Sequence, residues 1–119
     1  MKYHEMKDYE YLCTVDRVID GDTVDVIVDL GFDIHHRIRI RLEGVDTPER
    51  GHDDWSRATA MLRDLMPRKI DQRPQVYMLR TYKTGKYGRW LGQLTRITDG
   101  VSESVNINEW MAREWPADV

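Results

Sequence analysis

Two short acidic segments contain the residues of this sequence that are best suited to chemistry. The first is Asp-Gly-Asp-Thr at residues 20–23, and the second is Asp-Thr-Pro-Glu at residues 46–49, with Arg41 shortly before it. Carboxylates at this density suit a hard divalent cation, which takes oxygen ligands. A guanidinium beside them suits a phosphate group. Acids, a cation and a phosphate together indicate phosphodiester chemistry.

Each of these residues also has an ordinary structural explanation when it is considered alone. Asp22 shares the strand parity of the valines that follow it and is expected to point inward, yet Asp-Gly is foremost a common turn. Thr47 precedes a proline, which favours extended backbone and fixes the direction of its carbonyl. Glu49 is explained as well by a helix or turn cap as by a role in a site. Arg37 and Arg39 are expected to form a solvated strand face.

A third element is basic and lies further along the chain. Lys-Tyr-Gly-Arg at residues 86–89 precedes a strand-like run, and its glycine permits a tight backbone from which Arg89 can reach across a barrel. Alone, such a segment is usually a solvated loop. Lys86, Tyr87 and Tyr82 are candidates for binding a nucleic acid through hydrogen bonds or stacking. A half-buried position at a strand end explains the two tyrosines equally well.

The composition limits the class of protein. The 119 residues suit one domain covering 1–119, and 40% apolar with 33% charged residues predicts a folded, soluble protein. A net charge of −3 argues against a large non-specific nucleic-acid footprint, which normally requires a basic domain, but not against a small metal-dependent site. The sequence indicates no membrane span and no export signal, so we expect a cytoplasmic location. A secreted form from which a signal has been removed is also compatible with it.

The cysteine and histidine residues point away from other kinds of site. Cys13 is the only cysteine, which excludes an intramolecular disulfide and fits a reducing compartment. It lies in a strand-like run, so we expect a buried thiol rather than a nucleophile. The histidines do not have metal-ligand spacing and are all expected at the surface; they are His4, His35, His36 and His52.

Hydrophobic patterning predicts the elements that position these residues. Residues 11–19, 23–30 and 36–42 alternate as a β-meander. A helix is expected next, capped by Asp53 or Asp54 and ended by Pro67. Two further strands are expected at 75–81 and 90–97, then a turn at Asp99-Gly100 and a helix at 106–114.

This order favours an OB-type fold: a five-stranded barrel with helices (α+β), one helix between strands 3 and 4 and one at the C-terminal end. The C-terminal helix is expected to bury Ile107, Trp110 and Met111. Trp90 and Trp115 are also expected to pack in the core. Because a fold does not assign a function, the function has to come from the site.

The order of the motifs resembles the staphylococcal nuclease (thermonuclease) family. Asp-Gly-Asp-Thr is followed by Arg-Leu, by Asp-Thr-Pro-Glu and by Lys-Tyr-Gly-Arg, and the resemblance extends from Tyr11 to Trp115. One such motif is a weak signal, whereas all of them in this order form a strong one. The resemblance implies an OB barrel that hydrolyses DNA and RNA with Ca²⁺. In that family two aspartates and a threonine carbonyl bind the ion, and they match Asp22, Asp46 and Thr47.

The resemblance also implies roles for the remaining residues. Glu49 matches a glutamate that acts as general base on the attacking water or positions it. Arg41 and Arg89 match two arginines that bind the phosphate and stabilise the transition state. Cleavage breaks the 5′ P–O bond and leaves a 3′-phosphate. The segment 51–55 departs from the family because it is shorter and more acidic than the usual basic loop. This difference affects the affinity for the substrate and the way it enters, not the metal site.

Two rival interpretations belong to other classes of protein. One is a catalytically inactive OB module that binds nucleic acid or a protein partner, and the other is a structural barrel with surface carboxylates. Degenerate family members are expected to lack one or more of the acids or arginines, and this sequence retains them all, which favours the enzyme. Nucleic acid is the expected partner, and nothing in the sequence indicates an obligate protein partner or a membrane.

Overall fold

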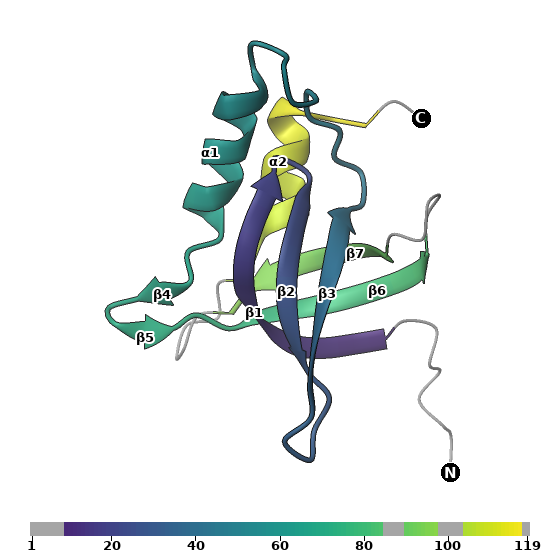
Figure 1. Cartoon of the computed structure of the whole chain (residues 1–119), viewed down its shortest axis with the longest axis vertical. Helices are drawn as coiled ribbons and strands as arrows, with labels where there is room; N and C mark the ends of the chain where they lie inside the picture. The colour runs from purple at the N-terminus through teal and green to yellow at the C-terminus, as the bar shows by residue number, and fades with distance from the viewer. Residues whose placement is uncertain (1–8, 85–89, 98–103, 118–119) are drawn as a thin grey trace.

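A computed structural model describes residues 9–84, 90–97 and 104–117 of the chain (Figure 1). The elements in chain order are β1 (Tyr9–Asp20), β2 (Thr23–Asp29), β3 (His35–Leu42), α1 (Trp55–Leu65), β4 (Lys69–Ile70), β5 (Arg73–Pro74), β6 (Tyr77–Thr84), β7 (Trp90–Arg96), β8 (Val105–Asn106) and α2 (Ile107–Glu114). The two helices lie side by side above one end of the sheet (Figure 1).

The long strands close into a barrel. Strand order is β3-β2-β1-β6-β7-β8, and β3 also pairs in parallel with β7, where Ile40 lies opposite Trp90 and Leu42 opposite Gly92. This pairing joins the two edges of the five-stranded set. Register shifts between Val15 and Arg17 and near Asp20 mark irregularities in β1, of the kind that bend a strand. The predicted OB-type barrel with two helices is therefore confirmed.

The core lies inside the barrel and under the helices. Val24, Val26 and Val28 of β2 are almost fully buried, as their alternation predicts. The helices add Leu62, Ile107 and Met111 to the same cluster, and Met66, at the C-cap of α1, joins it. Cys13 is also buried there, and burial raises the pKa of its thiol to about 12, so the thiol stays protonated at neutral pH.

Two predicted core tryptophans lie at the surface instead. Trp110 is 44% exposed on the outer side of α2, where the Arg113 guanidinium lies 4.4 Å from its ring centroid. Trp90 is 37% exposed and lines a cavity of about 360 Å³ together with Val28, Leu30 and Ile38. It therefore stands at a mouth of the barrel rather than inside it. Trp115 packs against the core as predicted, with partial exposure.

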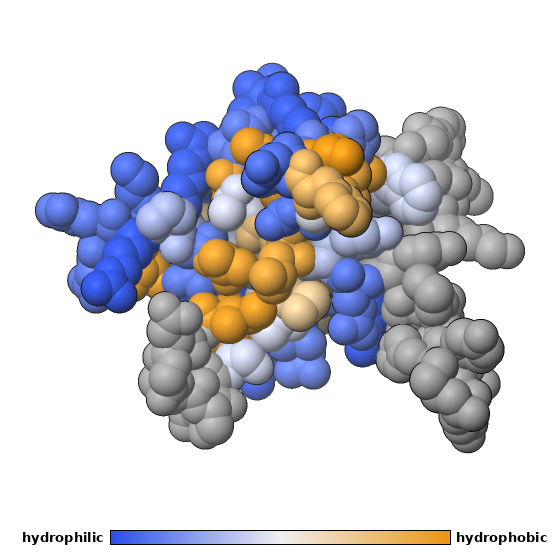
Figure 2. Space-filling view, turned by 90° about the horizontal axis from the view of Figure 1, so that it is seen from below, coloured by the Kyte–Doolittle hydropathy of each residue, from blue (hydrophilic) through white to orange (hydrophobic). Residues whose placement is uncertain are grey.

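Apolar side chains reach the surface at the lower end of the molecule. The β2–β3 connection forms this end in Figure 1, and Leu30, Phe32 and Ile34 within it are exposed. Seen from below, apolar surface gathers into a patch among hydrophilic residues (Figure 2). In the part of the chain described, no helix has the length and apolar character needed to cross a membrane.

Several local predictions need correction. The short hairpin β4–β5 was not predicted, because its turn uses Asp71 and Gln72 at φ 53° and 65°, and glutamine is not a usual residue for left-handed backbone. Asp54 occupies the N-cap position of α1 but makes no capping hydrogen bond through its side chain. Asn106 caps α2 by accepting from the Glu109 amide. The predicted turn at Asp99-Gly100 lies outside the described residues.

Candidate functional site

Asp22 lies at the turn between β1 and β2, and its carboxylate is held on several sides. Its Oδ1 accepts from the Thr23 hydroxyl at 2.9 Å, and its Oδ2 accepts from the Thr47 amide at 3.2 Å. The Asp22 carbonyl also accepts from the amide of Leu42, at the end of β3. Asp22 is 8% exposed. These contacts join the two acidic segments across the top of the barrel, so that they form one site.

Gly21 permits this close approach. A Cβ added to it would lie 2.7 Å from Thr47 Cγ2, 2.8 Å from Ala58 Cβ and 2.9 Å from Thr47 Oγ1. Distances below 3.0 Å are not found for real Cβ atoms, so a side chain here would displace either the second acidic segment or α1. The backbone of Gly21 does not adopt a positive φ, so conformation alone does not require a glycine here. Close packing is what requires it.

Arg41 bridges the two acidic segments electrostatically. Its Nη1 lies 3.1 Å from Asp22 Oδ2 and donates to the Val45 carbonyl at 2.9 Å, while its Nη2 lies 3.5 Å from Asp46 Oδ1. The side chain of Arg41 is 24% exposed and that of Asp46 is 58% exposed. The Nη1 end of the Arg41 guanidinium therefore lies against the buried Asp22 carboxylate, and its Nη2 end lies beside the exposed carboxylate of Asp46.

The C-terminal end of the described chain supports the second acidic segment. The Asp46 amide donates to the Trp115 carbonyl at 3.0 Å, and the Ala117 amide donates to the Gly44 carbonyl at 3.1 Å. Val45 forms a β-bridge with Pro116. The residues that follow α2 thus hold the backbone from which Asp46 projects.

The pKa values of the two carboxyl groups in the first acidic segment shift in opposite directions. Burial, the hydrogen bond to Asp22 and its negative charge raise the pKa of Asp20 to about 6. Burial also acts to raise the pKa of Asp22, but the hydrogen bond with Asp20, the charge of Arg41 and the Thr47 amide outweigh it and lower that pKa. Asp22 is therefore the stronger acid of the pair and is ionised at neutral pH.

The structure brings together some of the predicted site residues and leaves others apart. Asp22, Arg41, Asp46 and Thr47 form one cluster. Glu49 follows it on an exposed turn, where its carbonyl accepts from the His52 amide. Four further predicted residues cannot be placed: Lys86, Tyr87 and Arg89 lie outside the described residues, as does the side chain of Tyr82.

The oxygen donors around Arg41 fit a hard cation such as Ca²⁺. Two carboxylates converge on one guanidinium, and Thr47 Oγ1 is a buried oxygen that has no hydrogen-bond partner among the described residues. Within the described residues, no three Asp, Glu, His or Cys side chains form a group able to hold a metal ion. A cation bound here would therefore combine the carboxylates of Asp22 and Asp46 with neutral oxygens, of which the Thr47 carbonyl is the predicted one.

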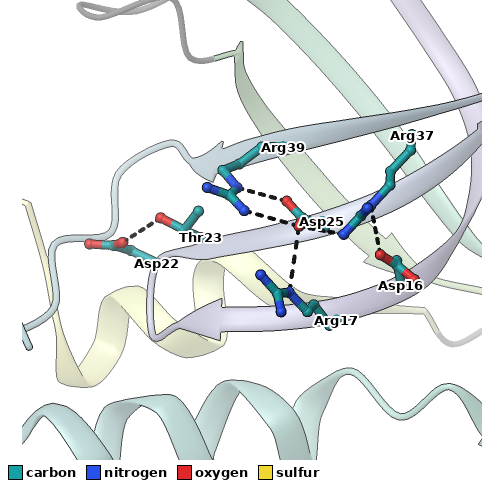
Figure 3. A network of polar contacts seen from close by, with 7 residues as sticks. All are labelled: Asp16, Arg17, Asp22, Thr23, Asp25, Arg37 and Arg39. Carbon is teal, nitrogen blue, oxygen red and sulfur yellow. Dashed lines mark hydrogen bonds and ion pairs between the residues drawn. The ribbon is translucent and has the colours of Figure 1, made fainter.

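A cluster of ion pairs beside the site was not predicted (Figure 3). Asp25 is 3% exposed, and its carboxylate accepts two hydrogen bonds from Arg39, with Arg37 at 3.3 Å and Arg17 at 3.8 Å. Hydrogen bonding to Arg39 leads the causes that lower the pKa of Asp25, and burial opposes them. Arg37 also pairs with Asp16 at 2.7 Å.

Arg37 and Arg39 are exposed, as expected of a solvated strand face. Their ion pairs with Asp25 were not expected, and this cluster joins β1, β2 and β3 next to the site. The hairpin register places Asp25 opposite Arg39 and Ile27 opposite Arg37. Acids and arginines that alternate on the same face of two paired strands were the available signal in the sequence.

Comparison with known proteins places the chain in a family. No protein-family model matches the chain. It is 35% identical over 101 residues to a micrococcal nuclease of Shigella flexneri, covering 82% of this chain and 52% of that protein. The matched part of the chain belongs to the staphylococcal nuclease-like family.

Two other relatives match shorter stretches of the chain. An uncharacterized endonuclease of Escherichia coli O157:H7 is 31% identical over 97 residues, covering 82% of this chain and 53% of the relative. The protein ParB of Escherichia coli is 35% identical over 79 residues, covering 64% of this chain and 37% of ParB. This staphylococcal nuclease-like chain thus spans about half the length of the first two relatives.

Proposed function

We propose that the chain is a Ca²⁺-dependent nuclease that hydrolyses phosphodiester bonds of DNA or RNA. The observation that carries the proposal is the placement of Arg41 between the carboxylates of Asp22 and Asp46. Relatives named as nucleases match 82% of the chain, which supports the same conclusion.

The proposed roles follow from the chemistry of each group. Asp22, Asp46 and the carbonyl of Thr47 would hold the cation. Bound Ca²⁺ would supply positive charge to neutralise the charge that develops on the phosphoryl oxygens. Arg41 has N–H groups beyond those it gives to Asp22, Val45 and Asp46, and these bind the phosphate. Because it is anchored before substrate arrives, its guanidinium requires little reorganisation in the transition state.

Glu49 and Arg89 complete the proposed reaction. The exposed carboxylate of Glu49 accepts a proton from the water that attacks phosphorus. The P–O5′ bond then breaks, the 5′ oxygen takes a proton from solvent and leaves as a hydroxyl, and a 3′-phosphate remains. Arg89 supplies a second guanidinium to the phosphate.

The test is an assay of the purified chain on single-stranded DNA and on RNA, with Ca²⁺ and with a chelator. We expect cleavage with Ca²⁺ that stops on chelation. Glu49→Gln should lower kcat by roughly 10²- to 10⁴-fold and leave Ca²⁺ binding, measured by calorimetry, intact. Glu109→Gln, on the exposed face of α2, is the matched control and should keep full activity.

Two outcomes would contradict the proposal. Cleavage that persists undiminished in chelator excludes the metal-dependent mechanism. No cleavage with any divalent metal, together with binding of the same DNA, assigns the chain to the inactive OB modules that bind nucleic acid.

A further inference from the structure

A cleft of about 680 Å³ lies between β1 and α1, away from the side chains of the candidate site. Its lining includes four arginines, Arg17, Arg50, Arg63 and Arg68, together with Trp55. Val15, Val18 and Met66 provide its apolar lining, along with a few other residues. The cleft therefore combines apolar and cationic residues.

The charge of this cleft is opposite to that of the chain. The net charge is −3, yet the described residues that line the cleft include four arginines and no Asp or Glu. Arg50, Arg63 and Arg68 are exposed, and none has a carboxylate at ion-pair distance within the described ranges. Arg17 lies 3.8 Å from Asp25, an acid that Arg37 and Arg39 already share. A concave wall of one charge sign focuses its field on a ligand of the opposite sign.

One aromatic contact orders part of this wall. The Arg50 guanidinium lies 5.0 Å from the centroid of the Trp55 ring. This cation–π contact limits the freedom of a side chain that would otherwise be mobile, and it leaves the N–H edge of the guanidinium available. A planar guanidinium with a free edge binds a phosphate through two parallel hydrogen bonds.

Both walls of the cleft lead directly to the candidate site. On β1, Val18 and Ile19 line the cleft, and the next residues in the chain form the turn that carries Asp22. On the other wall, Arg50 directly follows Glu49. The cleft and the candidate site are therefore built from adjoining segments of the chain.

We propose that this cleft binds the phosphodiester backbone of the nucleic acid on one side of the bond that is cleaved. The inference rests on the proposed nuclease function for its substrate class and adds a second contact surface to it. Arginine–phosphate contacts carry no sequence information, so the cleft contributes affinity and alignment rather than base preference. It also supplies cationic surface that the acidic segment 51–55 does not.

Binding of 5′-fluorescein-labelled dT16, measured by anisotropy in EGTA, tests the cleft without cleavage. The double variant Arg63→Gln/Arg68→Gln removes two cleft charges. Arg73→Gln/Arg113→Gln removes two exposed charges elsewhere and is the matched control. The cleft variant should bind roughly 5- to 30-fold more weakly. Its slope of log K against log salt should be smaller in magnitude by about 1.4, the value for two lost contacts with a single strand.

Cleavage assays then separate this inference from the proposed function. The cleft variant should raise KM for dT16 and leave hydrolysis of bis(4-nitrophenyl) phosphate, which is too small to reach the cleft, unchanged. Equal binding of dT16 by the cleft and control variants would overturn the inference, whether or not the chain is a nuclease. Binding that depends on the cleft without any cleavage would sustain the inference and refute the nuclease. Poly-glutamate is the competitor that tests for an acidic polypeptide ligand. If it displaces dT16 and has the higher affinity of the two, the cleft binds an acidic polypeptide, and the nucleic-acid interpretation is overturned.

Discussion

Arg41 lies between two carboxylates whose negative charges stabilise its guanidinium, and the close packing around it depends on Gly21, which has no side chain. Asp22 and Asp46 would repel each other without a cation between them, and the guanidinium supplies that charge. The approach of the two acidic segments depends in turn on Gly21, which lets Thr47 and Ala58 pack directly against the turn. The geometry of the charged groups therefore depends on an uncharged residue.

The packing role of Gly21 gives a prediction about stability. Gly21→Ala should lower the free energy of unfolding by about 1–3 kcal/mol, the usual range for an overpacked site. Thr47→Ser removes Cγ2, the atom nearest to the new Cβ. The double variant should therefore be more stable than the sum of the two single effects predicts, by at least about 0.5 kcal/mol in urea unfolding.

Gly31→Ala is the control for this prediction. Gly31 has a φ of +81° and open space around its Cβ position, so its substitution costs conformational strain alone. Thr47→Ser should not relieve that strain. Strictly additive effects of Gly21→Ala and Thr47→Ser would contradict the packing explanation.

The elements differ in how far the sequence could predict them, because their signals act over different distances. The β1–β2–β3 meander follows from local alternation and an Asp-Gly turn, and it formed as predicted. The β3–β7 pairing that closes the barrel joins distant segments and has no local signal. Motif order predicted Asp22 and Asp46 as site residues, whereas the hydrogen bond from the Thr47 amide to Asp22 spans 25 residues and could be found only from the fold.

The ion-pair cluster on Asp25 predicts a pH dependence for the three-strand element. Because the pKa of Asp25 is lower in the folded chain than its usual value of about 4, its stabilisation is present above that pH. It is lost as the pH falls through the folded-state pKa. At pH 7, Asp25→Asn should lower the free energy of unfolding by about 1–3 kcal/mol.

This difference between wild type and Asp25→Asn should shrink steadily in urea unfolding below about pH 4. Asp29→Asn alters an exposed acid on the same strand and should change the stability by less than about 0.5 kcal/mol. A difference at Asp25 that is the same at pH 3 and pH 7 would show that the carboxylate charge is not its cause.

At the scale of the whole molecule, one buried amide joins α2 to the closed barrel. Asn108 is 5% exposed, and its Oδ1 accepts from the Leu94 amide at 2.9 Å. Its Nδ2 donates to the carbonyls of Glu43 and Gly92, at 2.9 and 3.0 Å. Those carbonyls belong to segments at the parallel seam between β3 and β7. The side chain therefore connects the last helix, the barrel closure and the chain that leads to Asp46.

Replacing this amide by a carboxyl group tests the connection. Asn108→Asp keeps an acceptor for Leu94 but turns an ionised oxygen toward two carbonyls, so its carboxyl pKa should rise in the folded state. A raised pKa makes the variant most stable below about pH 4, where folded and unfolded chains are both protonated. Its stability relative to wild type at the same pH should then fall as the pH rises from about 4 toward the folded-state pKa of the introduced carboxyl group. This comparison removes the pH dependence contributed by the raised pKa of Asp20. Urea unfolding across this range measures the effect, with Asn108→Ala as the uncharged comparison, expected to lose about 2–4 kcal/mol at every pH. An Asp variant as stable as wild type at pH 7 would mean that the amide donors do not hold the helix to the barrel.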